Sequence, residues 1–298
     1  MGEILSGEEI AKEIRGELQK EVRLLKAENN LVPGLAVVLV GDNPASMSYI
    51  RGKRKACEDL GMYSTERNLA ANVSEADVIS VVEELNTAPE IHGILVQLPL
   101  PEGFTQENER NIINVVKPEK DVDGLHPINL GKLVRGEEGF LPCTPHGVKQ
   151  ILMRRNIKVE GKHVVIVGRS ILVGRTLANI LLQKEPGANA TVTICHTGTQ
   201  NLAEFTQQAD ILIVAAGRPN TVTPDMVREG TVVIDVGVNQ VADSSRKRGY
   251  RLVGDVDFEG VREKASAITP VPGGVGPMTI TMLLYNTVWA AKKFNGIS

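Results

Sequence analysis

The chain has 298 residues, which is enough for two domains with cores of their own. The formal net charge is −3, no basic tract occurs and only 3% of residues are aromatic, so nucleic acid is not expected as a partner. Three cysteines without a CxxC pair (Cys57, Cys143 and Cys195) indicate a reducing compartment, hence the cytoplasm, and no zinc site. We also expect no signal peptide and no membrane segment, because the acidic start runs into a helical pattern and no apolar run is long enough.

The first half of the chain alternates helical and strand patterns. Ser6 is a plausible N-cap, with Glu9 completing a capping box, for a helix running to about Glu28. Ser74 is a second N-cap, followed by acidic residues in the first helical turn. Strands are expected at 35–40, 66–72 and 91–98. This half has no glycine-rich phosphate turn, so we interpret it as the substrate-binding α/β lobe.

Within this lobe, Tyr49 and Lys53 lie four residues apart and share one helix face. Gln97 ends an apolar strand, where a buried amide would need a partner. A site made of Tyr49, Lys53 and Gln97 is one interpretation. The other is a basic surface patch, because Arg51 and Lys55 are close by.

Two carboxylates follow in the segment 118–124, which reads PEKDVDG. A calcium loop is not expected, because no Glu stands at the twelfth position. Asp121 is interpreted as a structural turn residue and Asp123 as the better candidate for binding a polar ligand. Thr144 as N-cap and Pro145 at the first helical position are expected to start the next helix, at the boundary between the lobes.

Residues 161–197 predict a nucleotide-binding βαβ unit. A β-branched run at 164–167 precedes the turn Gly168-Arg169-Ser170, a helical pattern follows, and a second β-branched run spans 191–195. Helix-start N–H groups and the helix dipole would bind phosphate there. Because Ser170 replaces the second glycine of the usual motif, any α/β domain with a glycine turn is the alternative.

The residues at the end of the run 191–195 indicate whether the dinucleotide is NAD or NADP. They read Cys195-His196-Thr197, without the carboxylate that holds the ribose 2′-hydroxyl of NAD. Arg169 and Thr197 could instead donate hydrogen bonds to the oxygens of a 2′-phosphate. The sequence therefore predicts NADP as cofactor.

Further buried strands are expected at 210–216, 231–236 and 253–256. The segment 269–279, TPVPGGVGPMT, is too rich in Gly and Pro for regular structure and too stiff for a linker. We interpret it as a shaped loop that offers backbone groups to a flat ligand, with Thr279 leading into a last helix that ends at Phe294.

Six segments in this order resemble the bifunctional methylenetetrahydrofolate dehydrogenase/methenyltetrahydrofolate cyclohydrolase family. They are YIRGK at 49–53, VQLPLP at 96–101, KDVDGLHPINLGKL at 120–133, PCTPHG at 142–147, GRSILVG at 168–174 and TPVPGGVGPMT at 269–279. The resemblance implies oxidation of methylenetetrahydrofolate with NADP and hydrolysis of the methenyl product to 10-formyltetrahydrofolate in one cleft. A dehydrogenase without the second activity is the alternative within the family.

The resemblance also implies roles for individual residues and a division of the chain. Lys53 would be the catalytic lysine, tuned by Gln97, with Tyr49 positioning the pterin and Asp123 accepting its N–H groups. The substrate would also meet Pro272, Gly273 and Gly276, and the cofactor would meet Gly168, Arg169, Ser170, Thr197, Val238 and Gly276. The family fold implies a folate lobe at 1–143, rejoined by a C-terminal helix at 277–298, a Rossmann-like parallel-sheet NADP lobe at 144–276, and a homodimer.

Two residues can be compared with the family pattern, and two other protein classes are alternatives to this family. An arginine would follow the strand-end histidine in an NAD-using variant, where this chain has Thr197. Val238 stands where the family more often has Ile.

A short-chain dehydrogenase also uses Tyr-x-x-x-Lys, but there the pair follows the cofactor turn, whereas Tyr49 precedes Gly168. A non-enzymatic dinucleotide-binding regulator would leave Gln97 and Asp123 without a task.

Overall fold

A computed structural model describes residues 1–246 and 249–297. The chain forms two compact units: unit 1 comprises Met1–Lys12 and Thr144–Thr279, and unit 2 comprises Glu13–Cys143 and Ile280–Ser298. The boundaries therefore fall inside helix α1 (Gly7–Asn29) and helix α10 (Val275–Phe294). The first twelve residues group with unit 1, and not with the N-terminal lobe as expected, because strand β1 (Glu3–Ile4) pairs with β11 (Ala267–Ile268).

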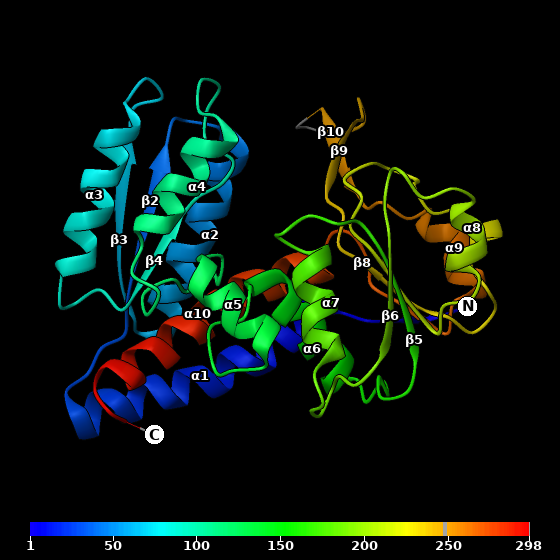
Figure 1. Cartoon of the computed structure of the whole chain (residues 1–298), viewed down its shortest axis with the longest axis horizontal. Coiled ribbons are helices and arrows are strands. Elements are labelled where there is room, and N and C mark those ends of the chain that lie inside the picture. The colour runs from blue at the N-terminus through cyan, green and yellow to red at the C-terminus, as the bar shows by residue number, and fades with distance from the viewer. Residues whose placement is uncertain (247–248, 298) are drawn as a thin grey trace. The chain divides into compact units, whose positions relative to one another are not determined.

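Unit 2 contains a three-stranded parallel sheet in the order β3-β2-β4 (Figure 1), formed by Tyr63–Leu69, Gly34–Val40 and Gly93–Val96. Every residue of β2 is buried, as expected for a central parallel strand covered on both faces. Helices α3 (Glu75–Thr87) and α4 (Gln106–Val115) pack against one face in a single apolar cluster. Helix α2 (Pro44–Leu60) contacts β2 and β3.

The N-cap residues predicted for α1 and α3, Ser6 and Ser74, are confirmed. The Glu9 N–H donates to Ser6 Oγ at 3.3 Å, and Ser74 forms a reciprocal capping box with Asp77. Two helices of unit 2 were not predicted. Helix α4 has only one buried residue, Ile112. Helix α5 (Pro127–Arg135) begins with a proline after the cap His126.

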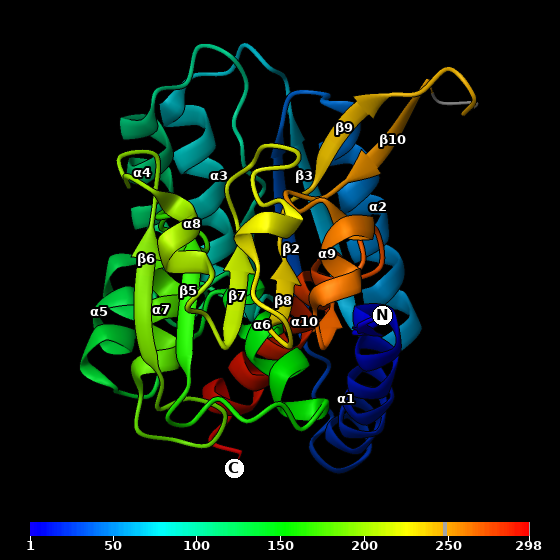
Figure 2. The ribbon, with the colours of Figure 1, turned by 90° about the vertical axis from the view of Figure 1, so that its right-hand side faces the viewer.

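Unit 1 is built on a six-stranded parallel sheet in the order β1-β11-β8-β7-β5-β6 (Figure 2). Its four longest strands are β5 (His163–Val167), β6 (Thr191–Cys195), β7 (Ile211–Val214) and β8 (Val232–Asp235). From β5 the chain passes to β6 on one side and then returns to β7 on the other. The helices of this unit are α6 (Cys143–Arg154), α7 (Gly174–Leu182), α8 (Leu202–Thr206) and α9 (Phe258–Lys264), with a 3₁₀ turn at Pro224–Met226.

Four sequence expectations need correction. Residues 253–256 do not form a strand of the main sheet: β10 (Tyr250–Val253) pairs antiparallel with β9 (Asn239–Ala242) as a separate hairpin. Strand β3 begins at Tyr63, three residues early, because Tyr63 already pairs with Gly34. Helix α6 starts at Cys143, ahead of Thr144 and Pro145, and α10 starts at Val275 instead of after Thr279. Proline is compatible with both starts, because first-turn N–H groups have no intrahelical acceptor.

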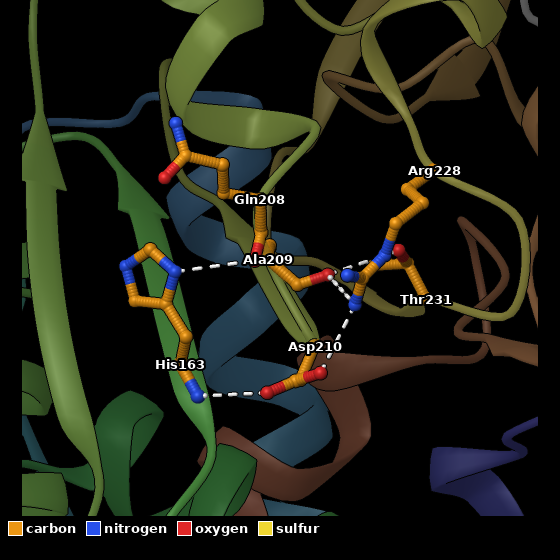
Figure 3. A network of polar contacts seen from close by, with 6 residues as sticks. All are labelled: His163, Gln208, Ala209, Asp210, Arg228 and Thr231. Atoms are coloured by element: carbon orange, nitrogen blue, oxygen red, sulfur yellow. Dashed lines mark hydrogen bonds and ion pairs between the residues drawn. The ribbon is translucent and has the colours of Figure 1, made fainter.

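A polar network joins the amino ends of the central strands of unit 1 (Figure 3). Asp210 accepts from the His163 N–H at 3.0 Å and from Arg228 Nη2 at 3.0 Å. The Ala209 carbonyl accepts from Arg228 at 3.2 Å and from Thr231 Oγ1 at 3.1 Å. These bonds fix the edge of the sheet opposite to the strand ends at which nucleotides bind in such folds.

Among the helices of the described residues, none is both long enough and apolar enough to cross a membrane.

Candidate functional site

Lys53 lies on the buried face of α2. The apolar residues Ile50, Ala56, Cys57 and Leu60 recur at helical spacing around it, and Lys53 itself is only 4% exposed. Its Nζ donates to Gln97 Oε1 at 2.7 Å and lies 4.9 Å from the centroid of the Tyr49 ring. The structure thus brings together the three residues that the helix spacing and the strand-end amide singled out, and the basic surface patch is not the environment of Lys53.

Gln97 directly follows β4 and is held in one orientation. Its Nε2 donates to the Leu98 carbonyl at 2.7 Å, which directs Oε1 toward Lys53. The amide therefore has the partner that its position required. An acceptor fixed in this way determines where the lysine nitrogen sits.

Among the charged groups around Lys53, Asp123 has the largest effect on the pKa of the amine. Burial lowers the pKa of Lys53 to about 8, and the charge of Asp123 partly opposes that shift. Burial raises the pKa of Asp123, while Lys53 and a hydrogen bond from Cys143 act in the opposite direction. At a pKa of about 8, roughly a tenth of the amine is neutral at pH 7. The site therefore holds a lysine that can accept a proton.

Asp121, two residues earlier, has a structural role, as expected. Its Oδ2 accepts from the His126 N–H and from Asn129 Nδ2, each at 2.8 Å, and Oδ1 accepts from the Leu125 N–H at 3.2 Å. These bonds close the loop that presents Asp123.

Two residues beside Asp123 were not singled out by the sequence. The buried Cys143 Sγ donates to the Val122 carbonyl at 3.3 Å and hydrogen-bonds Asp123, and burial raises the pKa of this thiol well above its usual range. Asn286, on α10, donates to the carbonyls of Val122 at 2.8 Å and Leu141 at 3.0 Å. The available signal was an asparagine within the apolar pattern of the last helix.

In unit 1, Gly168 directly follows β5, at the point where the sheet order reverses. Its φ is 137°, and a Cβ there would lie 2.3 Å from the Ala215 carbonyl oxygen, at the end of β7. A Cβ on Gly174 would lie 2.1 Å from the Gly168 carbonyl oxygen. These close approaches form a narrow backbone cradle at the start of α7, which fits the pyrophosphate of a dinucleotide.

The other predicted cofactor residues lie at the same carboxyl edge of this sheet. Arg169 and Ser170 are exposed in the turn after β5, and Ser170 Oγ accepts from the Val173 N–H at 3.2 Å. Thr197 is exposed two residues after β6, and Val238 is 60% exposed three residues after β8.

The glycine- and proline-rich segment follows β11 at this edge. Gly273 has a φ of 99°, and its carbonyl accepts from the Glu8 N–H at 3.1 Å. Gly276 lies in the first turn of α10. Pro272, Gly273 and Gly276 belong to unit 1, whereas Tyr49, Lys53, Gln97 and Asp123 belong to unit 2.

Together these features define a class: a two-unit enzyme with a dinucleotide-binding parallel sheet and a second unit carrying a lysine suited to proton transfer. Comparison with known proteins gives the family. The NAD(P)-binding domain of tetrahydrofolate dehydrogenase/cyclohydrolase matches residues 142–295, and the catalytic domain matches residues 5–123. The chain belongs to the tetrahydrofolate dehydrogenase/cyclohydrolase family.

Known relatives and solved structures are similar to this chain over nearly its full length. The bifunctional protein FolD of Dehalococcoides mccartyi is 58% identical over 295 residues, covering 99% of this chain and 98% of the relative. The protein of the same name from Bacillus subtilis is 52% identical, covering 97% and 98%. The crystal structure of FolD from Campylobacter jejuni has a TM-score of 0.91 at 47% identity, covering 99% and 100%.

The enzyme from Trypanosoma brucei, solved with NADP cofactor and an inhibitor, has a TM-score of 0.92 at 38% identity, covering 99% of this chain and 98% of that one. The family, the two-part α/β fold and the dinucleotide cofactor predicted from the sequence are confirmed.

Proposed function

We propose that this protein oxidises 5,10-methylenetetrahydrofolate with NADP⁺ and then hydrolyses the methenyl product to 10-formyltetrahydrofolate. The observation that carries the proposal is the buried Lys53 Nζ, 2.7 Å from a fixed Gln97 oxygen. A dehydrogenase alone needs no such base, because the two folate nitrogens stabilise the methenyl cation. Bound NADP⁺ supplies the hydride acceptor for the first step.

In the hydrolysis, we assign Lys53 the proton transfers. Its neutral amine takes a proton from the water that attacks the methenyl carbon, so a C–O bond forms while the ammonium is generated. The ammonium then protonates N5 as the C–N5 bond breaks, which regenerates the neutral amine. The carbinol hydroxyl releases its proton to solvent as the formyl C=O bond forms on N10, so the hydrolysis releases one proton overall. Gln97 holds Nζ in place through both transfers, because its oxygen accepts from either form of the amine.

We assign the remaining residues to binding. The Tyr49 ring borders Nζ and is placed to pack against the pterin, and Asp123 offers acceptors to the pterin N–H groups. Gly168, Ser170 and the start of α7 hold the pyrophosphate, and Val238 and Gly276 provide further cofactor contacts. Pro272 and Gly273 present backbone groups to the ligands.

NADP is favoured over NAD because β6 ends without a carboxylate. Arg169 and Thr197, both exposed at this edge, suit a 2′-phosphate. We further propose a homodimeric cytoplasmic enzyme in which unit 2 binds folate and unit 1 binds NADP.

The proposal is tested by product analysis. Purified protein receives methylenetetrahydrofolate with NADP⁺ or NAD⁺, and separately methenyltetrahydrofolate without a nucleotide. We expect NADPH and 10-formyltetrahydrofolate from the first mixture and loss of methenyltetrahydrofolate in the second. Oxidation without any acceleration of methenyl hydrolysis would instead support the dehydrogenase-only alternative.

A further inference from the structure

Two buried aspartates lie at the carboxyl edge of the unit 1 sheet and have no part in the reaction described above. Asp235, the last residue of β8, is 2% exposed, and Asp255, two residues after β10, is 0% exposed. Neither was singled out by the sequence. Buried carboxylates are rare unless hydrogen bonds compensate them, so the partners of this pair show what it organises.

Asp235 fixes the backbone around Asp255. Its Oδ1 accepts from the N–H groups of Gly237 at 2.9 Å and Asp255 at 3.0 Å, and its Oδ2 accepts from the Val256 N–H at 3.0 Å. A Cβ on Gly254 would lie 1.8 Å from Asp235 Oδ2. The chain around Asp255 is therefore built closely onto this carboxylate.

Asp255, in turn, binds the two loops that follow β7 and β8. Its Oδ2 accepts from the N–H groups of Ala216 at 2.6 Å and Gly217 at 2.8 Å, and its Oδ1 accepts from Asn239 Nδ2 at 2.8 Å. A Cβ on Gly237 would lie 2.1 Å from the Asp255 Cγ. One carboxylate thus joins 216–217 to 237–239.

Both loops border the cofactor cradle. Ala215 directly precedes Ala216 and Gly217, whose N–H groups donate to Asp255. Its carbonyl oxygen lies so close to Gly168 that a Cβ there would be only 2.3 Å away. Val238, which we assign to cofactor binding, lies between Gly237 and Asn239. Gly237 donates to Asp235, and Asn239 donates to Asp255. The width of the cradle and the position of Val238 therefore depend on the same carboxylate.

We propose that Asp255 is a positioning residue for the dinucleotide: it sets the loops after β7 and β8 and thereby the affinity for NADP. This inference rests on the proposed function, since the dinucleotide it positions is the one used there. It predicts an effect on cofactor binding that is separate from methenyl hydrolysis, which consumes no nucleotide.

The first test replaces Asp255 by Asn. The shape is kept, but the amide NH₂ then faces the Asn239 NH₂ or the two backbone N–H groups, so buried donors lose an acceptor. We expect the Kd for NADP, measured by calorimetry without folate, to rise about tenfold or more, because an unsatisfied buried donor carries a cost of that order. The KM for NADP⁺ should rise likewise, while kcat and methenyl hydrolysis stay within about twofold, since the lysine site is built from other residues.

Asp210→Asn is the matched control. This carboxylate also accepts a backbone N–H and pairs with an arginine in unit 1, but at the amino edge of the sheet (Figure 3). We expect a lower melting temperature with unchanged NADP affinity. A rescue variant distinguishes positioning from general damage: Asp255→Asn combined with Asn239→Asp exchanges donor and acceptor and should recover much of the NADP affinity.

The inference is overturned if Asp255→Asn binds NADP like the wild type, or if its NADP affinity falls only in step with stability, as the Asp210→Asn comparison would reveal. If Asp255→Asn does not fold, Asn239→Ala, which removes one donor to Asp255, must still weaken NADP binding. Failure of the proposed function is a separate outcome: wild-type protein would then bind NADP in the calorimeter but turn over neither folate.

Discussion

Lys53 Nζ and Gln97 Oε1, 2.7 Å apart, join the buried face of α2 to the end of β4. The two bonded residues are 44 positions apart in the chain. Because Gln97 is itself fixed by the Leu98 carbonyl, the amine has little freedom to reorient. This relationship underlies the first two predictions.

The pH dependence of methenyl hydrolysis should follow the Lys53 amine. Only the neutral form accepts a proton, and burial places the pKa at about 8, so kcat/KM should rise with pH and level off above about pH 8. The charge of Asp123 raises this pKa, so Asp123→Asn should move the midpoint to lower pH, whatever it does to KM. A midpoint that is unchanged in the variant, or a rate that falls as the pH rises toward 8, would contradict this assignment.

Gln97→Leu should impair hydrolysis more than folate binding. The substitution removes the acceptor of the Lys53 amine and leaves an apolar group of similar size. We expect kcat for methenyl hydrolysis to fall by about tenfold or more, since misplacing a catalytic group is costly. Gln19→Leu, at a half-buried position of α1 where the amide donates to the Asp59 carbonyl, serves as a control. Equal activity in the two variants would remove Gln97 from the mechanism.

Replacing Asp121 by Asn should destabilise unit 2. Its carboxylate accepts from two backbone N–H groups and from the Asn129 amide, and an asparagine would turn a donor toward at least one of them. The expected loss in free energy of unfolding is about 1–3 kcal/mol, measured by urea denaturation. Asp59→Asn, on an exposed part of α2, should change the free energy of unfolding by less than about 0.5 kcal/mol. Comparable losses in both variants would contradict the structural role of Asp121.

Arg169→Ala should reduce the preference for NADP. Losing a charge-assisted hydrogen bond to the 2′-phosphate is expected to raise the KM for NADP⁺ about tenfold and to leave the KM for NAD⁺ nearly unchanged. Arg110→Ala, which removes an exposed arginine from α4 in unit 2, is the control and should alter neither constant. If both KM values rise equally in Arg169→Ala, the arginine does not read the phosphate.

The sequence predicted those parts of the fold and site that depend on local patterns. The β-branched runs and the glycine turn located β5, α7 and β6, and the i, i+4 spacing placed Tyr49 and Lys53 on one face of α2. Gln97 was found because an amide at the end of an apolar strand requires a partner.

The parts that were missed depend on contacts between distant segments. Asn286 meets Val122 across 164 residues, and Asp255 meets Ala216 across 39. Strand β11 has only two residues and is recognised by its pairing with β1 and β8. It is too short to form a run of β-branched residues that would predict a strand. Local periodicity carries no information about such pairings.

The central claim, that Lys53 performs the proton transfers of hydrolysis, is tested most directly by comparing Lys53→Met with Lys55→Met. Lys55 is exposed on the same helix and supplies a matched change of charge and shape. Loss of methenyltetrahydrofolate and reduction of NADP⁺ are followed by absorbance in separate assays. We expect Lys53→Met to lose about a hundredfold or more in hydrolysis, the usual contribution of a general base, while Lys55→Met resembles the wild type. Methenyl hydrolysis that persists at the wild-type rate in Lys53→Met would contradict the mechanism.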